Sequence, residues 1–454
     1  MRSLDARRII LTMRRFMDRT HAWRASVLRF LPVLLLLCIA GFSRAQTSPS
    51  EDSIPRAFLV TVEPGDAPWE RFGHDMLVIG DPNGSAVAIN YGVFDFDAPD
   101  FIGNFVKGKM TYWMELDDWQ PTRQMYIKAN RSMWIQELNL AGAQRLALID
   151  KLRQNAQPQN KYYRYDYYRN NCTTKVRDVL NDVVGGEIEK QLKALQTGTT
   201  YRWHTRIGMA EYFWLYTGLE LAMGPPCDVK LSAWEEGFLP AKLMDDLNRV
   251  TIDDSSGHRL PLIKSESQLF KSTRAPLPTR PPNWWPGFLL VGFLIGGAMV
   301  AAARRSYRRT TITMAIAWSL ICSLASIFLL CLWFFTDHEA GYRNENLFQF
   351  SPLSFVVIVA ALRGFRWKSS RIIVMIPLTI ATLGVVLKVL PWFREWNWEF
   401  VSLALPVHAG LAIAVTIIAK HGGVGASPTS DAPAKMGRRG AHATRNKKAI
   451  EESR

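Results

Sequence analysis

The sequence predicts a mixed α+β domain outside the cytoplasm, followed by a bundle of five membrane-spanning helices. Three observations lead to this fold class. An arginine-rich N-terminus precedes an apolar run from Phe30 to Phe42, as in a secretory signal. The segment 56–250 mixes the periods of strands and helices, and residues 286–419 contain five apolar stretches.

Residues 1–45 are predicted to be a signal peptide or an uncleaved signal anchor. Eight arginines lie in the first 29 residues, against only Asp5 and Asp18. Ser43-Arg44-Ala45 fits the small-x-small pattern of a cleavage site, whereas the long basic region favours an anchor. Either form would export the segment that follows.

The five apolar stretches are predicted membrane spans at 286–303, 311–335, 349–362, 372–392 and 400–419, the third being short. Basic residues follow the first, third and fifth spans, so these ends should be cytoplasmic. Together with the N-terminus, these basic segments account for the whole net charge of +15. The charge therefore reflects membrane orientation, and we expect no nucleic-acid partner.

The remaining boundaries follow from composition. Residues 46–270 have the mixed periodicity of a soluble domain, and the proline-rich stretch 271–285 is predicted to be a stiff linker onto the membrane domain at 286–420. Residues 421–454 are rich in small and basic residues without an apolar period, which predicts a disordered cytoplasmic tail.

Alternating apolar residues predict the strands of the soluble domain. The expected strands are 57–62, 74–79, 86–91, 109–116 and 133–140, with helices at 122–131 and 144–155. The turn sequence Asp81-Pro82-Asn83-Gly84 predicts a hairpin between the second and third strands.

The most informative helix begins at Cys172. Asn171 can cap it, apolar residues recur from Val176 to Val183 at helical spacing, and Gly185-Gly186 ends it. Cys172 then lies on the buried side of a helix N-terminus, where unpaired N–H groups favour the thiolate form. Its own N–H is placed to serve as half of an oxyanion hole. Cys172 is therefore the predicted nucleophile.

A nucleophilic cysteine needs a base, and His74 is the leading candidate because it opens a strand after Gly73. His204 is the competing histidine. A third group should orient the imidazole: a three-residue hairpin loop places Asn90 on the side of His74, whereas a two-residue loop places Tyr91 there. We favour Asn90, with Asp95 as the reserve.

These motifs resemble the Lnb family, the Bacteroides-type lipoprotein N-acyltransferases. The likeness covers about 57–247 closely and the membrane part loosely. The residues that carry it include Arg71-Phe72-Gly73-His74, Asn90-Tyr91-Gly92-Val93-Phe94-Asp95-Phe96, Tyr165-Asp166, Asn171-Cys172-Thr173-Thr174, Tyr201-Arg202 and Phe238-Leu239-Pro240.

The resemblance implies a papain-like, permuted NlpC-type domain in the periplasm, held on the bacterial inner membrane. It implies that Cys172 is the nucleophile and His74 the base, with no cofactor and no metal. A phospholipid would supply the acyl group, and the acceptor would be the N-terminal cysteine amine of a diacylated lipoprotein. The residues expected to bind substrate are Tyr91, Tyr165 and Arg202.

Alternatives remain open for these residues and for the function. The tyrosine stretch 162–168 could touch lipid headgroups or line a sheet edge, and Arg202 could hold a phosphate or be a solvated charge. The same dyad could serve a peptidase or amidase acting on the cell wall. A disulfide between Cys172 and Cys227 would instead indicate a non-catalytic scaffold.

Overall fold

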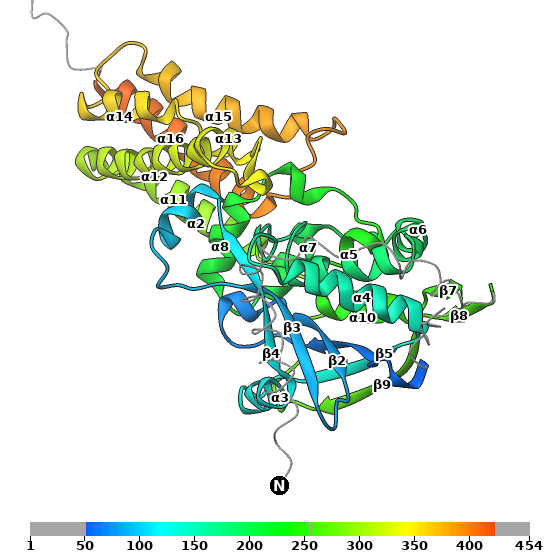
Figure 1. Ribbon diagram of the computed structural model, residues 1–454. Coiled ribbons are helices and arrows are strands. Elements are labelled where there is room, and N and C mark those ends of the chain that lie inside the picture. The colour runs from blue at the N-terminus through cyan, green and yellow to red at the C-terminus, as the bar shows by residue number, and fades with distance from the viewer. Residues whose placement is uncertain (1–50, 254–256, 423–454) are drawn as a thin grey trace, which may run out of the picture.

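The computed structural model describes residues 51–253 and 257–422, which form two connected parts (Figure 1). Residues 51–270 form a domain built on a β-sheet, here called the sheet domain. Residues 285–422 form a bundle of apolar helices, here called the helix bundle. The predicted mixed α+β class is confirmed. The predicted signal at 1–45 lies outside the described residues.

Seven strands form one sheet in the order β6-β4-β3-β2-β1-β5-β9, and every neighbouring pair is antiparallel. The strands are β1 (Ala57–Val62), β2 (His74–Gly80), β3 (Ala86–Val93), β4 (Thr111–Asp118), β5 (Met133–Leu138), β6 (Tyr162–Arg164) and β9 (Ile263–Phe270). A separate hairpin pairs β7 (Thr251–Asp253) with β8 (Arg259–Pro261). Five of these strands lie close to their predicted positions.

The two faces of the sheet bury different side chains because successive residues of a strand point to opposite sides. On one face, Leu59, Leu77 and Ile89 pack against four helices, and Ala233 of a fifth helix joins the same core. On the other face, Val60, Met76 and Ala88 pack against a single helix. The first group of helices is α4 (Gly142–Asn155), α5 (Cys172–Val183), α6 (Glu187–Lys193) and α10 (Pro240–Leu247), and the single helix is α3 (Trp119–Lys128).

Four further short helices belong to the sheet domain. They are α2 (Phe101–Lys107), α7 (Tyr201–Gly208), α8 (Phe213–Ala222) and α9 (Ala233–Glu236). From Lys271 to Trp284 the chain has no regular secondary structure, as the proline-rich composition predicts.

The helix bundle contains four helices long and apolar enough to cross a membrane, together with one shorter apolar segment, Asn346–Leu362, within the described residues. The long helices are α11 (Trp285–Arg304), α12 (Arg308–Phe335), α15 (Ser370–Leu387) and α16 (Trp398–Gly422), and the short segment comprises α13 (Asn346–Gln349) and α14 (Ser354–Leu362). The five elements match the five predicted spans, including the short third one. Residues 423–454 of the predicted tail lie outside the description.

The sheet domain is docked on the end of the bundle at which α12 ends and α16 begins (Figure 1). The Asp337 N–H donates to the Lys107 carbonyl at 2.8 Å, which joins α2 to the loop after α12. On the other side of the interface, the buried Arg206 of α7 pairs with Glu399 of α16 at 2.7 Å. These contacts hold the domain at a defined position relative to the membrane helices.

Candidate active site

Cys172 is the first residue of α5, and a hydrogen-bonded cap holds that helix start in place. Asn171 Oδ1 accepts from the Thr174 N–H at 2.9 Å, and Thr174 Oγ1 accepts from the Asn171 N–H at 2.8 Å. This reciprocal capping box satisfies two donors that a helix start leaves unpaired. Asn171 Nδ2 also donates to the Phe238 carbonyl at 2.9 Å, which ties the cap to the chain before α10.

Cys172 lies against the backbone of β2 and β3. A Cβ placed on Gly92 would lie 3.2 Å from the Cys172 Cβ, so the helix start touches β3 directly. Burial raises the pKa of the thiol, while hydrogen bonds from the Asp75 N–H, the Thr173 hydroxyl and N–H, and the N–H of Cys172 itself act in the opposite direction. The N–H groups act as the sequence predicts, but burial outweighs them, and the resting group is a thiol that needs a base.

His74 opens β2 and is held by a chain of two side-chain hydrogen bonds. Its Nε2 lies 3.0 Å from Asn90 Oδ1, and Asn90 Nδ2 donates to Asp117 Oδ2 at 2.9 Å. A carboxylate only accepts, so the amide nitrogen of Asn90 faces Asp117 and its oxygen faces His74. His74 must then donate from Nε2, which leaves the lone pair on Nδ1 free to take a proton.

Burial lowers the pKa of His74, and the Asn90 hydrogen bond partly opposes that effect, while the nearby Arg131 guanidinium lowers the pKa further. The imidazole is therefore neutral near pH 7, which is the form that a general base requires.

The register of the sheet brings these groups to one corner. Met76 pairs with Asn90, and Gly92 follows Asn90 by two residues on β3. Cys172 meets Gly92 on β3 and the N–H of Asp75, the residue after His74. The sulfur therefore lies beside the strand end that carries His74. The roles of Cys172 and His74 in catalysis stay predictions.

The hairpin turn decides which residue faces His74. The Asp81 N–H donates to the Ser85 carbonyl at 3.0 Å, which leaves the three-residue loop Pro82–Gly84 and places Asn90 on the side of His74. The reserve residue Asp95 is exposed and accepts from the Asp97 N–H at 2.9 Å in a local turn.

The competing histidine is engaged elsewhere. His204 is buried in α7, and its Nε2 lies 2.8 Å from Glu236 Oε1 and 3.0 Å from Thr199 Oγ1. A histidine held between these two groups has the contacts of a structural residue, whereas His74 directly precedes Asp75, whose N–H is bonded to the Cys172 sulfur.

Two of the expected substrate-binding residues are near the site. Tyr91 is buried below it, and its hydroxyl accepts from Asn155 Nδ2 at 2.8 Å. Tyr165 stacks on Tyr112 with ring centroids 4.2 Å apart. Burial raises the pKa of Tyr165 well above its usual value, and the neighbouring Cys172 adds to that effect. Tyr165 is therefore a neutral, apolar wall beside the thiol.

Arg202 lies in a different place from the one expected. It is 1% exposed, and its guanidinium pairs with Asp228 at 2.9 Å and with Glu220 at 3.5 Å. It also donates to the Met223 carbonyl at 2.7 Å and lies 3.9 Å from Glu395 of the helix bundle. Because the protein itself occupies these donors, Arg202 supports the docking of the two parts, and we do not assign it to a substrate phosphate.

Two carboxylates near the site did not emerge from the sequence. Asp117 supports Asn90 as described, and Asp75 is fully buried with its Oδ1 accepting from Thr61 Oγ1 at 2.7 Å. Burial is the main cause that raises the pKa of Asp75 to about 7, and the hydrogen bond from Thr61 opposes it. The sequence could have predicted the burial of Asp75, because strand alternation places it on the same face of β2 as Leu77 and Ile79.

A chain of aromatic rings, here called the aromatic track, runs from the thiol toward the bundle. Successive ring centroids lie 4.2 to 6.5 Å apart. The chain ends at His338, in the loop that follows α12. Its members in order are Tyr165, Tyr112, Phe94, Phe101, Phe105 and His338.

The described cysteines are all free, including Cys172 and Cys227. Cys227 is buried, with its sulfur 3.5 Å from the Ala340 carbonyl, so the disulfide of the scaffold alternative is not formed. Within 51–253 and 257–422, no three His, Cys, Asp or Glu side chains gather in a way that could hold a metal ion.

Fold and site together define a membrane-anchored protein whose sheet domain brings a cysteine, a histidine and an asparagine to one corner. Comparison with known families gives two matches, the Lnb N-terminal periplasmic domain over residues 47–206 and the Lnb transmembrane domain over residues 282–421. The chain belongs to the Lnb family, and its sheet domain is periplasmic. No curated protein and no solved structure matches the chain.

Proposed function

We propose that this protein is a thiol acyltransferase of the bacterial inner membrane. Cys172 takes a fatty acyl group from a phospholipid and passes it to the α-amino group of the N-terminal cysteine of a diacylated lipoprotein. The proposal joins the geometry of the site to the family membership, and it is carried by the aromatic track between the thiol and the membrane end of the domain.

The track supports an acyl-chain substrate because its rings form a continuous apolar row, and a hydrocarbon that lay against it would lose contact with water. At its membrane end, α2 exposes Ile102 and Val106, 65% and 58% accessible respectively. Both lie on the helix that is bonded to the loop after α12, at the end of the bundle that carries the sheet domain. A hydrolase of soluble cell-wall peptides has no use for such a path.

In the first half-reaction, His74 Nδ1 accepts the thiol proton as the Cys172 sulfur attacks the ester carbonyl of the phospholipid. Backbone N–H groups at the start of α5 stabilise the negative charge on the carbonyl oxygen. The C–O bond then breaks, the lysophospholipid leaves with the proton from His74, and the acyl group remains on sulfur as a thioester.

In the second half-reaction, the amine of the lipoprotein attacks the thioester carbonyl while His74 takes a proton from the nitrogen. The C–S bond breaks, the thiolate recovers the proton from His74, and the product is an amide. Asn90 keeps Nε2 of His74 in the donor state through both steps, so the same nitrogen, Nδ1, carries the proton each time.

The test uses the full-length protein in detergent with a phospholipid radiolabelled in its acyl chains. We expect a labelled adduct that hydroxylamine releases, since thioesters are sensitive to it. The adduct should disappear in Cys172→Ala and be strongly reduced in His74→Ala. Cys227→Ala is the matched control and should keep the adduct.

A synthetic diacylated lipopeptide with an N-terminal cysteine should then discharge the label into an amide. Labelled free fatty acid without amide formation would instead identify a thiol hydrolase. An adduct that persists in Cys172→Ala would refute the assignment of the nucleophile.

A further inference from the structure

A second site lies at the end of the helix bundle opposite the sheet domain. A cavity of about 740 Å³ opens there between the ends of α11 and α16 and the two connections that join α11 to α12 and α14 to α15. This volume lies within the range of about 300–1,000 Å³ that small-molecule sites occupy. The sheet domain is periplasmic, so this end faces the cytoplasm, in agreement with the basic residues at 304–309 and 363–371.

The lining of the cavity combines cationic and apolar side chains. Four cations, Arg308, Arg366, Lys368 and Arg371, surround it, and its apolar lining comes from Ala303, Phe365, Trp367, Ile418 and Ala419. No acidic residue belongs to this lining. In the part of the chain that the structure describes, none of the four cations has a carboxylate within ion-pairing distance.

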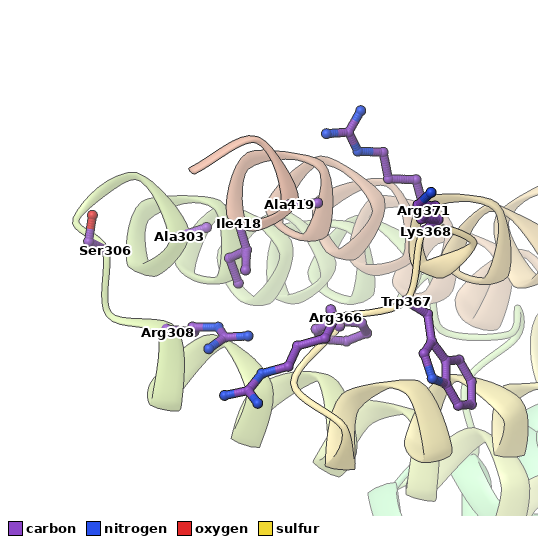
Figure 2. A pocket seen from close by; sticks show the side chains of 10 residues that line it. Ala303, Ser306, Arg308, Arg366, Trp367, Lys368, Arg371, Ile418 and Ala419 are labelled. Atoms are coloured by element: carbon purple, nitrogen blue, oxygen red, sulfur yellow. The ribbon is translucent and has the colours of Figure 1, made fainter. Parts of the chain in front are cut away.

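Figure 2 shows that Arg308 and Arg366 extend into the same space from opposite walls, whereas Arg371 points outward. Arg308 comes from the start of α12, where it also donates to the Gly364 carbonyl at 2.5 Å, and Arg366 comes from the connection after α14. Two guanidinium groups that share a space repel one another unless an anion lies between them. Guanidinium is also the group that binds phosphate oxygens in a bidentate way.

The backbone of both connections is unusual at this place. Ser306 and Phe365 line the cavity and adopt φ angles of 60° and 54°, in the left-handed region that side chains other than glycine rarely enter. Both turns end a helix: the Tyr307 N–H donates to the Ala302 carbonyl and the Phe365 N–H to the Ala360 carbonyl, each at 2.8 Å. These bonds fix the two walls of the cavity on the ends of α11 and α14.

We propose that this cavity binds the headgroup of an anionic phospholipid of the inner leaflet. Its phosphate lies between Arg308 and Arg366, and its acyl chains leave along the apolar lining into the bilayer. A lipid is favoured over free phosphate because the site lies at the membrane surface and a large part of its lining is apolar. Basic pockets between transmembrane helices on the cytoplasmic side bind such headgroups. This site is separate from the thiol site on the opposite side of the membrane.

The test is native mass spectrometry of the full-length protein released from micelles that contain either phosphatidylglycerol or phosphatidylethanolamine. We expect one retained phosphatidylglycerol and much less phosphatidylethanolamine. Removing one charge with Arg366→Gln should lower retention about fivefold, which is the change in binding that one basic residue near an anionic membrane surface typically contributes. Arg366→Lys should keep most of the retention, which would show that charge and not folding is responsible.

The matched control is Arg309→Gln, which removes an equally exposed charge on the same cytoplasmic end but outside the cavity lining. It should leave retention unchanged. Equal retention of the two lipids, equal loss in Arg309→Gln and Arg366→Gln, or unchanged retention in Arg366→Gln would each overturn the proposal. Inorganic phosphate that protects the protein against thermal unfolding as well as phosphatidylglycerol does would overturn the assignment to a lipid.

Discussion

The contact between Gly92 and Cys172 makes a sharp test of the site geometry. Gly92 has a φ of 84°, so Gly92→Ala places a side chain in the left-handed region, which costs about 1–2 kcal/mol. The new methyl group would lie 3.2 Å from the Cys172 Cβ, whereas carbon atoms prefer roughly 3.5–4.0 Å. Cys172 must therefore move by about 0.3–0.8 Å.

A displacement of this size should slow acylation markedly. Productive geometry tolerates about 0.5 Å, and a misplacement of about 1 Å can reduce the rate about a hundredfold. We expect the rate of adduct formation in Gly92→Ala to fall by about 10- to 100-fold, while the protein stays folded. The assay is the initial rate of labelling from phospholipid, together with the thermal unfolding temperature in detergent.

Gly186→Ala is the matched control, because Gly186 has a φ of 88° and an added Cβ meets nothing within 4 Å. It should lower the unfolding temperature to a similar extent and leave the labelling rate unchanged. If Gly92→Ala is labelled at the wild-type rate, or if both variants lose the same activity, the close approach of β3 to Cys172 does not position the thiol.

Three further predictions concern the groups around the thiol. Asn90→Ala should reduce labelling by up to about tenfold, the value of one orienting hydrogen bond, and an unchanged rate would exclude Asn90 as the group that positions His74. Because the pKa of His74 is lowered from 6.5, labelling should hold down to pH 6.5 and fall only below it as the base becomes protonated, so an acid limb above pH 6.5 would contradict the neutral imidazole. Asp75 has a pKa raised from 3.8 to about 7, so the folded state holds its proton more tightly and stability should decrease as pH rises from about 4 to 7. Asp75→Asn should remove that decrease and stabilise the protein at pH 8 by at most about 4 kcal/mol, measured as thermal unfolding at pH 5 and pH 8 against the wild type.

Local sequence signals predicted much of the site. The alternation of β2 and β3 and the turn between them placed Asn90 on the side of His74, and the structure has the corresponding contact at 3.0 Å. Asn171 as a cap put Cys172 at the start of α5. These features depend on residues within about twenty positions of one another, where hydrogen bonding along the chain and the period of the strand decide the geometry.

Other parts of the site could not be predicted, because they depend on which strands become neighbours. Asp117 contacts Asn90 because β4 pairs with β3. This pairing brings together two residues that lie 27 positions apart in the chain. The net pKa of Cys172 depends on burial by the packed sheet, which reversed the direction that the helix start alone suggested. An arginine is expected to be a solvated surface charge, but Arg202 is buried where the sheet domain docks on the helix bundle.

By itself, the sequence determined the membrane spans, their orientation, the strands, and the residue types of the site, because hydrophobic periodicity and charge act locally along the chain. The tertiary structure decided which nitrogen of His74 is free, which tyrosines adjoin the thiol, and how the aromatic track and the cytoplasmic cavity form. Those features arise from packing between segments far apart in the chain, where burial and the pairing of strands set the energy of each charge.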